Sequence, residues 1–308
     1  SIAPLQRASS DISRELGVTK PGIQIENDRE PNRIQVLAPR SDREFPLLPD
    51  KVLPPGDETY LPVLVGVDLG GQSVISSISS WPHALVGGTT GSGKTTFLRS
   101  LVRQVANYGH QSRVIVVDGK GESDYFGLVP DGVFHTSFPE ILMDADGAKD
   151  VMHWLAQEEV PRRKELIRDL ARSQGRKVDA RTEYLASDRQ NASALMTPLV
   201  VVIDEFAEIM LRAGQTARSF TDDVSSVAQT ARSVLVHLVL ATQRPDRQII
   251  APRIHANLDT KIALRVPQHH DSQTMLGRGG AEKLLGAGDM LFSWRGEAVQ
   301  RLQSFYVP

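Results

Sequence analysis

The stretch HALVGGTTGSGKTTFLRSL, residues 83–101, contains residue types at a spacing that could hold a phosphate group. Gly88, Gly93, Lys94 and Thr95 match the pattern G-x-x-x-x-G-K-[ST]. Glycines let the backbone wrap a phosphate closely, and a helix that starts there adds free amides and a positive dipole end. We expect Lys94 to reach the β- and γ-phosphates of ATP and Thr95 to offer its hydroxyl to Mg²⁺. The predicted nucleotide-binding residues are Gly88, Thr89, Thr90, Gly91, Ser92, Gly93, Lys94, Thr95 and Thr96.

The stretch LVVVIDEF places two carboxylates, Asp204 and Glu205, at the end of an apolar run. Ligands of α/β sheets bind at the carboxyl ends of the strands, so both side chains are expected beside the glycine-rich loop. We predict that Asp204 holds Mg²⁺ through its water shell and that Glu205 orients the water that attacks the γ-phosphate. Phosphoryl transfer depends on positioning and charge neutralisation, and this pair supplies both.

Two more polar residues flank the apolar run HLVLAT. Gln243 follows the run and could contact the γ-phosphate; the alternative is an ordinary hydrogen bond to a loop. Arg232 precedes the run, where it cannot easily reach its own loop across the sheet but could reach a neighbouring subunit. Such an arginine contributes on the order of 10³–10⁵ in rate, and the alternative is an exposed arginine at a helix end. Asp118 and Lys120, after the run VIVV, are lesser candidates for the same site.

Apolar runs that alternate with helical patterns must position these residues. HALVGG, SRVIVVD, PLVVVID and VLVHLVLAT are apolar almost throughout, as is typical of strands buried on both faces. KTTFLRSLVRQVANYG has helical periodicity, and residues 149–175 read as a long charged helix with a kink or break at Pro161. The alternation predicts an α/β fold with a mostly parallel sheet.

Residues 1–80 follow a different pattern. SSDISRELGV reads as a short helix capped by Ser10 or Asp11, and GIQIEND and NRIQVLAP alternate as strands do. PVLVGVDLGGQSVISSI reads as a hairpin that turns at Gly70 and Gly71. We therefore predict a small α+β subdomain over residues 1–80 and a larger ATPase domain over residues 81–308.

Composition narrows the class of protein. The 308 residues contain no cysteine, which excludes a disulfide framework and a thiolate metal site and fits the cytoplasm. No run of 18 apolar residues is present, so we expect no membrane contact within this chain, and the initial Ser suggests a piece of a larger protein. The net charge of −2 argues that any contact with nucleic acid is local, such as loops that line a pore.

Five stretches together resemble the FtsK/SpoIIIE motor family, within the wider HerA–FtsK group of ring ATPases. They are PHALVGGTTGSGKTT, VVVIDEFAEIM, HLVLATQRPD, TKIALRV and GGAEKLLGAGDMLF. The resemblance is strong over residues 60–308 and weaker over residues 10–60. It implies a RecA-like P-loop NTPase core, a homo-hexamer that threads double-stranded DNA through a central channel, and ATP hydrolysis at subunit interfaces.

The resemblance also implies roles at matching positions. Lys94 and Thr95 would bind nucleotide and Mg²⁺, and Asp204 and Glu205 would be the metal and catalytic acids. Gln243 would be the sensor of the γ-phosphate.

Other positions concern the neighbouring subunit and DNA. Arg232 would be the finger that acts in trans, and Lys261 matches an arginine that is usual in the family. Arg244 matches a basic channel position, and Arg244 and His269 are the candidate DNA contacts. His269 and Gln273 stand where many members carry Lys and Arg, so this channel is less basic than usual.

Three functions compete. The first is an ATP-driven translocase of double-stranded DNA. The second is a type VII secretion-like ATPase that moves protein substrates, since such proteins often carry DFKG where this chain has DGKG. The third is a nucleotide-bound assembly module with little turnover, against which the intact Glu205 argues. The segment GAEKLLGAGDML favours the DNA translocase.

Overall fold

The computed structural model describes most of the chain. The described residues are 3–18, 23–27, 34–39, 42–51, 53, 59–81, 83–122, 124–186, 196–246 and 249–308. None of the helices in these ranges has the length and apolar character needed to span a bilayer.

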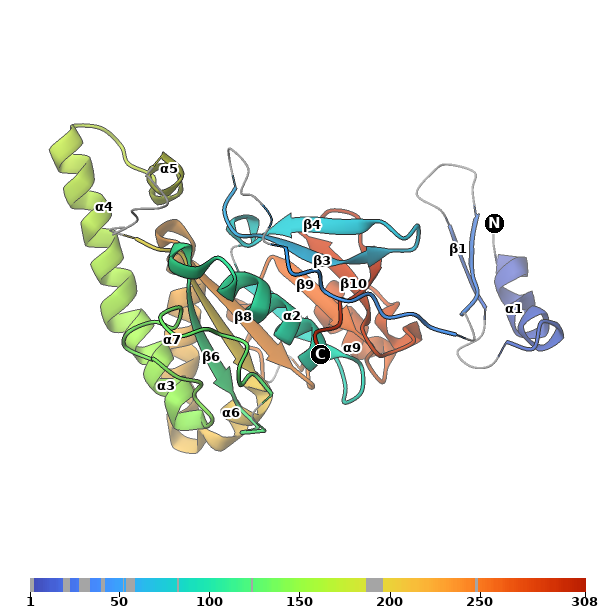
Figure 1. Ribbon diagram of the computed structural model, residues 1–308. Helices are drawn as coiled ribbons and strands as arrows, with labels where there is room; N and C mark the ends of the chain where they lie inside the picture. The colour runs from blue at the N-terminus through green and yellow to red at the C-terminus, as the bar shows by residue number, and fades with distance from the viewer. Residues whose placement is uncertain are drawn as a thin grey trace.

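A nine-stranded sheet organises the molecule (Figure 1), with the strand order β4-β3-β11-β10-β9-β5-β8-β7-β6. Its parallel strands are β5 (His83–Gly87), β6 (Arg113–Asp118), β7 (Leu199–Asp204), β8 (Val236–Thr242) and β9 (Thr260–Leu264). The remaining strands continue the sheet in antiparallel fashion: β3 (Pro62–Asp68), β4 (Ser73–Ser77), β10 (Asp289–Trp294) and β11 (Gln300–Gln303). The predicted α/β class is confirmed, and the apolar runs form four of the five parallel strands, β5, β6, β7 and β8.

Helices cover both faces of the sheet (Figure 1). They are α2 (Lys94–Ala106), α3 (Ala145–Trp154), α4 (Val160–Gln174), α5 (Ala180–Ala186), α6 (Phe206–Arg212), α7 (Ala217–Thr230), α8 (Pro252–His255) and α9 (His269–Leu276). Successive residues of a strand point to opposite faces, so β7 supplies two cores. Val200 and Val202 pack with α2, whereas Val201 and Ile203 pack with α3 and α7. This double burial explains why the strand has no polar face.

The predicted long helix is one helical run with a local change of winding. A π-helical turn, residues 155–159, joins α3 to α4, and Pro161 follows in the first turn of α4. Proline lacks the N–H that an α-helix interior needs, and it is tolerated here because it lies in the first turn of α4, directly after the π-helical turn. Gly175, at φ 62°, ends α4.

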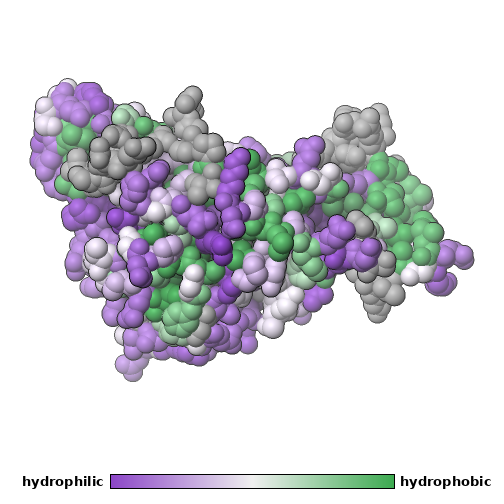
Figure 2. Space-filling view, in the orientation of Figure 1, coloured by the Kyte–Doolittle hydropathy of each residue, from purple (hydrophilic) through white to green (hydrophobic). Residues whose placement is uncertain are grey.

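The N-terminal residues form a separate small unit. It consists of α1 (Ala3–Glu15) and an antiparallel pair, β1 (Gln24–Asn27) with β2 (Ile34–Leu37). This unit lies at the far end of the molecule in Figure 1, and Figure 2 shows hydrophobic surface around α1. The predicted cap at Ser10 or Asp11 is wrong, because α1 runs from Ala3 through both residues. Ser9 and Ser13 hydroxyls donate to the carbonyls of Gln6 and Ser9, which lets serine remain inside a helix.

The predicted hairpin at Gly70 and Gly71 is β3–β4, and it belongs to the main sheet. β3 pairs with β11, and β4 is the outer strand beyond it. A domain boundary at residue 80 would therefore fall between β4 and β5 of one sheet, while α1, β1 and β2 form a unit of their own. The division into residues 1–80 and 81–308 stays a prediction.

Candidate active site

The loop between β5 and α2 is fixed by backbone hydrogen bonds on two sides. On one side, Gly88 N donates to the Thr242 carbonyl at 3.2 Å, and Thr89 N donates to the Arg265 carbonyl at 3.0 Å. On the other side, the turn at residues 286–288 donates its amides to the carbonyls of the loop. Gly288 N lies 2.7 Å from the Ser92 oxygen, and Ala287 N lies 3.2 Å from the Gly91 oxygen. The loop conformation is therefore determined by its neighbours.

Two glycines of the motif are required by this packing. Gly93 has φ 96°, in the left-handed region, and a Cβ there would lie 2.3 Å from Gly288 N. A Cβ on Gly88 would lie 2.6 Å from Ser92 Oγ and 2.8 Å from Leu264 Cβ. No larger residue fits at either place without moving the loop. The segment GAGD, residues 286–289, belongs to the stretch GGAEKLLGAGDMLF that resembles the family. In the structure it packs against the phosphate loop and donates hydrogen bonds to it.

Lys94 and the two predicted acids form a buried ionic cluster. The Lys94 ammonium contacts Asp204 Oδ1 and lies 2.7 Å from Glu205 Oε1. The three side chains are only 3%, 3% and 6% exposed. Charges removed from water in this way need close partners, and removal of one partner leaves the others uncompensated. Residues 110 positions apart are therefore brought together as predicted.

Glu205 is held at the junction of β7 and α6 in an unusual backbone conformation. Its φ of 55° is left-handed, which is uncommon for a residue with a side chain and occurs often at functional positions. Gln243 Nε2 donates to Glu205 Oε1 at 2.8 Å, and Thr90 Oγ1 donates to Gln243 Oε1 at 2.9 Å. Gln243 therefore connects the phosphate loop to the acid that we expect to orient water.

A residue that sequence reasoning missed completes the cluster. Tyr125 OH donates to Asp204 Oδ2 at 2.7 Å, and this side chain is fully buried. Burial and the charge of Asp204 raise the pKa of Tyr125 well above its ordinary value. Nothing near Tyr125 in the sequence signals this role, because the two residues are 79 positions apart and lie on different segments.

The segment after β6 brings Lys120 to the same cluster. Asp118 Oδ1 and Oδ2 accept hydrogen bonds from the amides of Lys120, Gly121 and Glu122, so Asp118 shapes this turn. Lys120 Nζ then lies 3.4 Å from Glu205 Oε1. Burial lowers the pKa of Lys120, but the charges of Glu205, Glu122 and Asp204 outweigh that effect and the pKa is raised. Lys120 therefore stays cationic beside the acidic pair.

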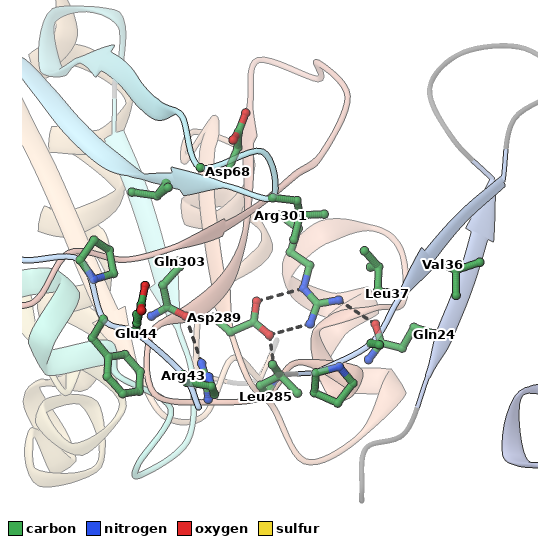
Figure 3. Close-up of a pocket in the computed structure, with 17 residues that line it drawn as sticks. Gln24, Val36, Leu37, Arg43, Glu44, Asp68, Leu285, Asp289, Arg301 and Gln303 are labelled. Carbon is green, nitrogen blue, oxygen red and sulfur yellow. Dashed lines mark hydrogen bonds and ion pairs between the residues drawn. The ribbon is translucent and has the colours of Figure 1, made fainter. Parts of the chain in front are cut away.

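The turn at residues 286–288 is in turn supported by the strands behind it. Arg301 on β11 pairs with Asp289 through two contacts, of 3.0 and 2.7 Å, and also donates to Gln24 Oε1 of β1 at 2.8 Å (Figure 3). Arg43 donates to the Gly286 carbonyl at 2.9 Å. These residues border a cavity of about 640 Å³ between β1–β2 and the main sheet. The N-terminal unit is thus connected to the phosphate loop through two layers of contacts.

The remaining predicted residues do not join the cluster. Arg232 lies on a 3₁₀ turn, residues 231–234, that precedes β8, whereas the phosphate loop meets the other end of this strand. Seven residues of β8 span roughly 20 Å at 3.3 Å per residue, so Arg232 cannot reach the phosphate loop of its own subunit.

The two candidate DNA contacts also lie outside the cluster. Arg244 is exposed just beyond β8, on the loop side of the sheet. His269 begins α9, with Nδ1 3.2 Å from Glu282 Oε1.

The donor set fits a nucleotide with Mg²⁺. Thr95 and Thr96 lie in the first turn of α2, whose amides have no partner within the helix. Ser92 Oγ is buried and has no hydrogen-bond partner among the described residues. The described residues also contain no cluster of three histidine, aspartate or glutamate side chains that could hold a metal alone. A magnesium ion here would rely on few protein ligands and on the phosphates, as is usual for this ion.

The fold and this site define a P-loop ATPase. Residues 56–247 match the FtsK/SpoIIIE family, and the chain belongs to that family. The resemblance that the sequence stretches suggested is therefore confirmed.

Known relatives agree with this assignment. The DNA translocase FtsK of Mesorhizobium japonicum is 31% identical over 97% of this chain and 36% of its own length. The DNA translocase FtsK of Pseudomonas aeruginosa is 30% identical over 94% of this chain and 37% of its own length. The chain thus spans little more than a third of the length of these relatives.

Solved structures share the fold. The conjugation coupling protein TcpA of pCW3, solved as a monomer with ATPγS, matches 99% of this chain and 82% of its own chain, with a TM-score of 0.70 and 24% identity. The cytoplasmic domain of the type VII secretion ATPase EccC of Thermomonospora curvata matches 82% of this chain and 29% of its own chain. Its TM-score is 0.68 and its identity is 25%.

Proposed function

We propose that this chain is the motor domain of an ATP-driven translocase of double-stranded DNA, and that it works as a homo-hexameric ring in the cytoplasm. The observation that carries the proposal is the buried cluster of Lys94, Asp204 and Glu205, with Gln243 bonded to it, in a chain whose curated relatives are named DNA translocases. A motor needs turnover, and this cluster contains a phosphate-binding cation, a metal ligand and a water-orienting acid together.

The residues of one subunit have separate tasks in this proposal. The amides of residues 88–96 and the Lys94 ammonium bind the phosphates of ATP. Thr95 and Asp204 hold Mg²⁺, which, when bound, neutralises charge on the phosphates. Glu205 orients the attacking water. In the structure the Lys94 ammonium contacts both carboxylates, and the phosphates of ATP would offer it a further partner.

Hydrolysis then depends on the contact between subunits. Arg232 lies at the opposite end of β8 from the phosphate loop, and its side chain is exposed. In a head-to-tail ring, one end of each subunit faces the other end of the next. We place Arg232 against the γ-phosphate of the neighbouring subunit, where a guanidinium stabilises the charge that develops during transfer.

DNA contact is local in this proposal. The chain has a net charge of −2, so the grip must come from loops that line the channel. Arg244 and His269 both lie beyond the carboxyl ends of parallel strands, on the loop side of the sheet. Gln243 would gain or lose its contact with the γ-phosphate during hydrolysis. If these segments move with Gln243, ATP hydrolysis is coupled to movement of DNA.

The test is the ATPase rate with and without long duplex DNA. We expect DNA to stimulate turnover and the stimulation to weaken as salt rises, because phosphate contacts release counterions. Arg244→Ala should reduce the DNA response and leave the DNA-free rate unchanged. Arg212, an exposed arginine on α6, provides the matched control Arg212→Ala. A rate that does not respond to DNA at low salt, in an assembly of confirmed mass, would contradict the proposal.

A type VII secretion-like ATPase is the second candidate. The likeness to EccC, at 25% identity over 82% of this chain, favours it. The same assay separates the two candidates, since a protein-exporting ATPase should respond to a substrate peptide and not to duplex length.

A further inference from the structure

A second group of cations lies at the amino ends of the parallel strands β8 and β9, opposite the end that the phosphate loop meets. A cavity of about 570 Å³ there is lined by Arg232, His255, Ala256, Leu258, Asp259, Lys261, Arg295 and Gly296. The sheet register explains the grouping. Lys261 is near the start of β9, which runs parallel to β5 and β8, and its partner across the antiparallel pair is Ser293, two residues before Arg295. Arg232 precedes β8 at the same end of the strands.

The charges of this cavity are not balanced. Arg232, Lys261 and Arg295 are cationic, and Asp259 is the one acidic residue in the lining. Lys261 is partly buried, and its ammonium lies 3.0 and 2.9 Å from the two ring nitrogens of His255. Burial lowers the pKa of Lys261 to about 8, although Asp259 opposes the shift. An anion that enters the cavity would stabilise this partly buried cation, because the lining supplies fewer negative than positive charges.

We propose that Arg232, Lys261 and Arg295 form an anion site that receives the terminal phosphate of the nucleotide held by a neighbouring copy of this chain. The proposal rests on the proposed function and extends it, since Arg232 alone was expected to act in trans. The nucleotide of the same subunit cannot be the ligand, because it lies at the other end of the sheet. Arg295 lies against the Trp294 ring at 5.3 Å, which limits the directions its guanidinium can take.

The substitution Lys261→Met tests this site, since it removes the charge and keeps an unbranched apolar stem. We expect turnover to fall on the order of 10²-fold, as for loss of one preorganised donor to a developing charge. Lys261→Arg should keep most of the activity. Arg218→Ala, an exposed arginine at the start of α7 and outside the cavity, is the matched control and should turn over as wild type does. Melting temperatures identify any variant that is merely unfolded.

Mixing of subunits shows whether Lys261 acts across the contact. Lys261→Met is combined with Glu205→Gln, and in a second series with Lys94→Ala, after sedimentation has established that wild type assembles on duplex DNA. If Lys261 acts in trans, an equal mixture recovers up to about a quarter of the wild-type rate, because intact loops meet intact cations at roughly one contact in four of a head-to-tail ring. If Lys261 acts within its own subunit, no mixture recovers.

The parallel mixture with Arg232→Ala separates the two proposals. Recovery with Arg232→Ala but not with Lys261→Met overturns the site and leaves the ring mechanism standing. Recovery with neither, or a wild-type chain that remains monomeric on DNA, contradicts the ring mechanism and the site with it. A Lys261→Met variant with wild-type turnover overturns the site. The site is also overturned if Lys261→Met only binds DNA more weakly and its DNA affinity depends less on salt, because Lys261 would then be a DNA contact.

Discussion

At the scale of single residues, the buried ionic cluster gives Lys94 a structural role besides its proposed role as a phosphate ligand. Lys94→Ala would remove the buried cation that contacts both Asp204 and Glu205 and leave, among the described residues, only Lys120 beside Glu205, and loss of one partner of a buried ion pair typically costs about 3–5 kcal/mol. We therefore expect loss of ATP hydrolysis together with a lower free energy of unfolding, measured by urea denaturation. Glu205→Gln is the comparison, because it should bind ATP, fail to hydrolyse it and keep Lys94 beside Asp204. Equal free energies of unfolding for Lys94→Ala and wild type would contradict the prediction and show that Asp204 and Glu205 rearrange to compensate for the lost charge.

Tyr125 gives a prediction that sequence alone did not supply. Tyr125→Phe removes only the hydroxyl that donates to Asp204 Oδ2. Without that bond Asp204 Oδ2 loses its donor, and among the described residues the carboxylate is held only through Oδ1, by Lys94 and the Glu205 amide. We therefore expect weaker binding of Mn²⁺ with nucleotide, measured by electron paramagnetic resonance, and a higher magnesium requirement for turnover. Tyr184→Phe is the matched control. The Tyr184 hydroxyl also donates a hydrogen bond, to the Gln111 carbonyl at 2.9 Å, and this bond lies away from the cluster. Unchanged metal affinity in Tyr125→Phe would exclude a positioning role.

At the scale of elements, the sequence predicted those features of the fold that are determined by residues close together in the chain. The parallel strands were predictable because burial on both faces leaves continuous apolar runs, and the phosphate loop because its glycines are needed where they stand. The junction of β3 with β11 was not, since the pairing joins Asp68 to Leu302 across most of the chain. The start of α1 was misplaced because Ser9 and Ser13 bond within the helix, whereas serine more often caps one.

The contact between the phosphate loop and the turn at 286–288 gives an element-scale prediction. Gly93 and Gly91 both have positive φ, at 96° and 73°, but only a Cβ on Gly93 would meet the turn, 2.3 Å from Gly288 N. Gly91→Ala should cost about 1 kcal/mol for the left-handed backbone and still bind nucleotide. Gly93→Ala should displace the loop, lower the melting temperature further and abolish binding of a fluorescent ATP analogue. Similar behaviour of the two variants would mean that the turn does not fix the loop.

At the scale of the whole molecule, the phosphate loop is connected to distant parts of the chain. Arg301 touches β1 through Gln24 and supports the 286–288 turn through Asp289, so the N-terminal unit and the nucleotide site share one set of contacts. The cationic cavity at Arg232 lies at the opposite ends of the parallel strands of the same sheet. A subunit therefore presents its phosphate loop at one end of these strands and its cations at the other, an arrangement that suits the proposed head-to-tail ring.

Global stability should depend on pH through His83, which begins β5 beneath the phosphate loop. Its Nδ1 accepts from Leu238 N at 3.0 Å, and burial together with the charge of His237 lowers the pKa of His83 from 6.5 to about 3. The folded state holds the neutral ring, so below pH 6.5 only the unfolded chain takes up the proton, and stability is lost as pH falls from 6.5 towards 3.

The variant His83→Asn tests this coupling, because it keeps an acceptor oxygen without a group that titrates. Between pH 7 and pH 5, we expect wild type to lose about 2 kcal/mol more than this variant in urea unfolding, and the exposed His270→Asn to lose as much as wild type. Parallel losses in His83→Asn and wild type would show that His83 does not couple folding to protons.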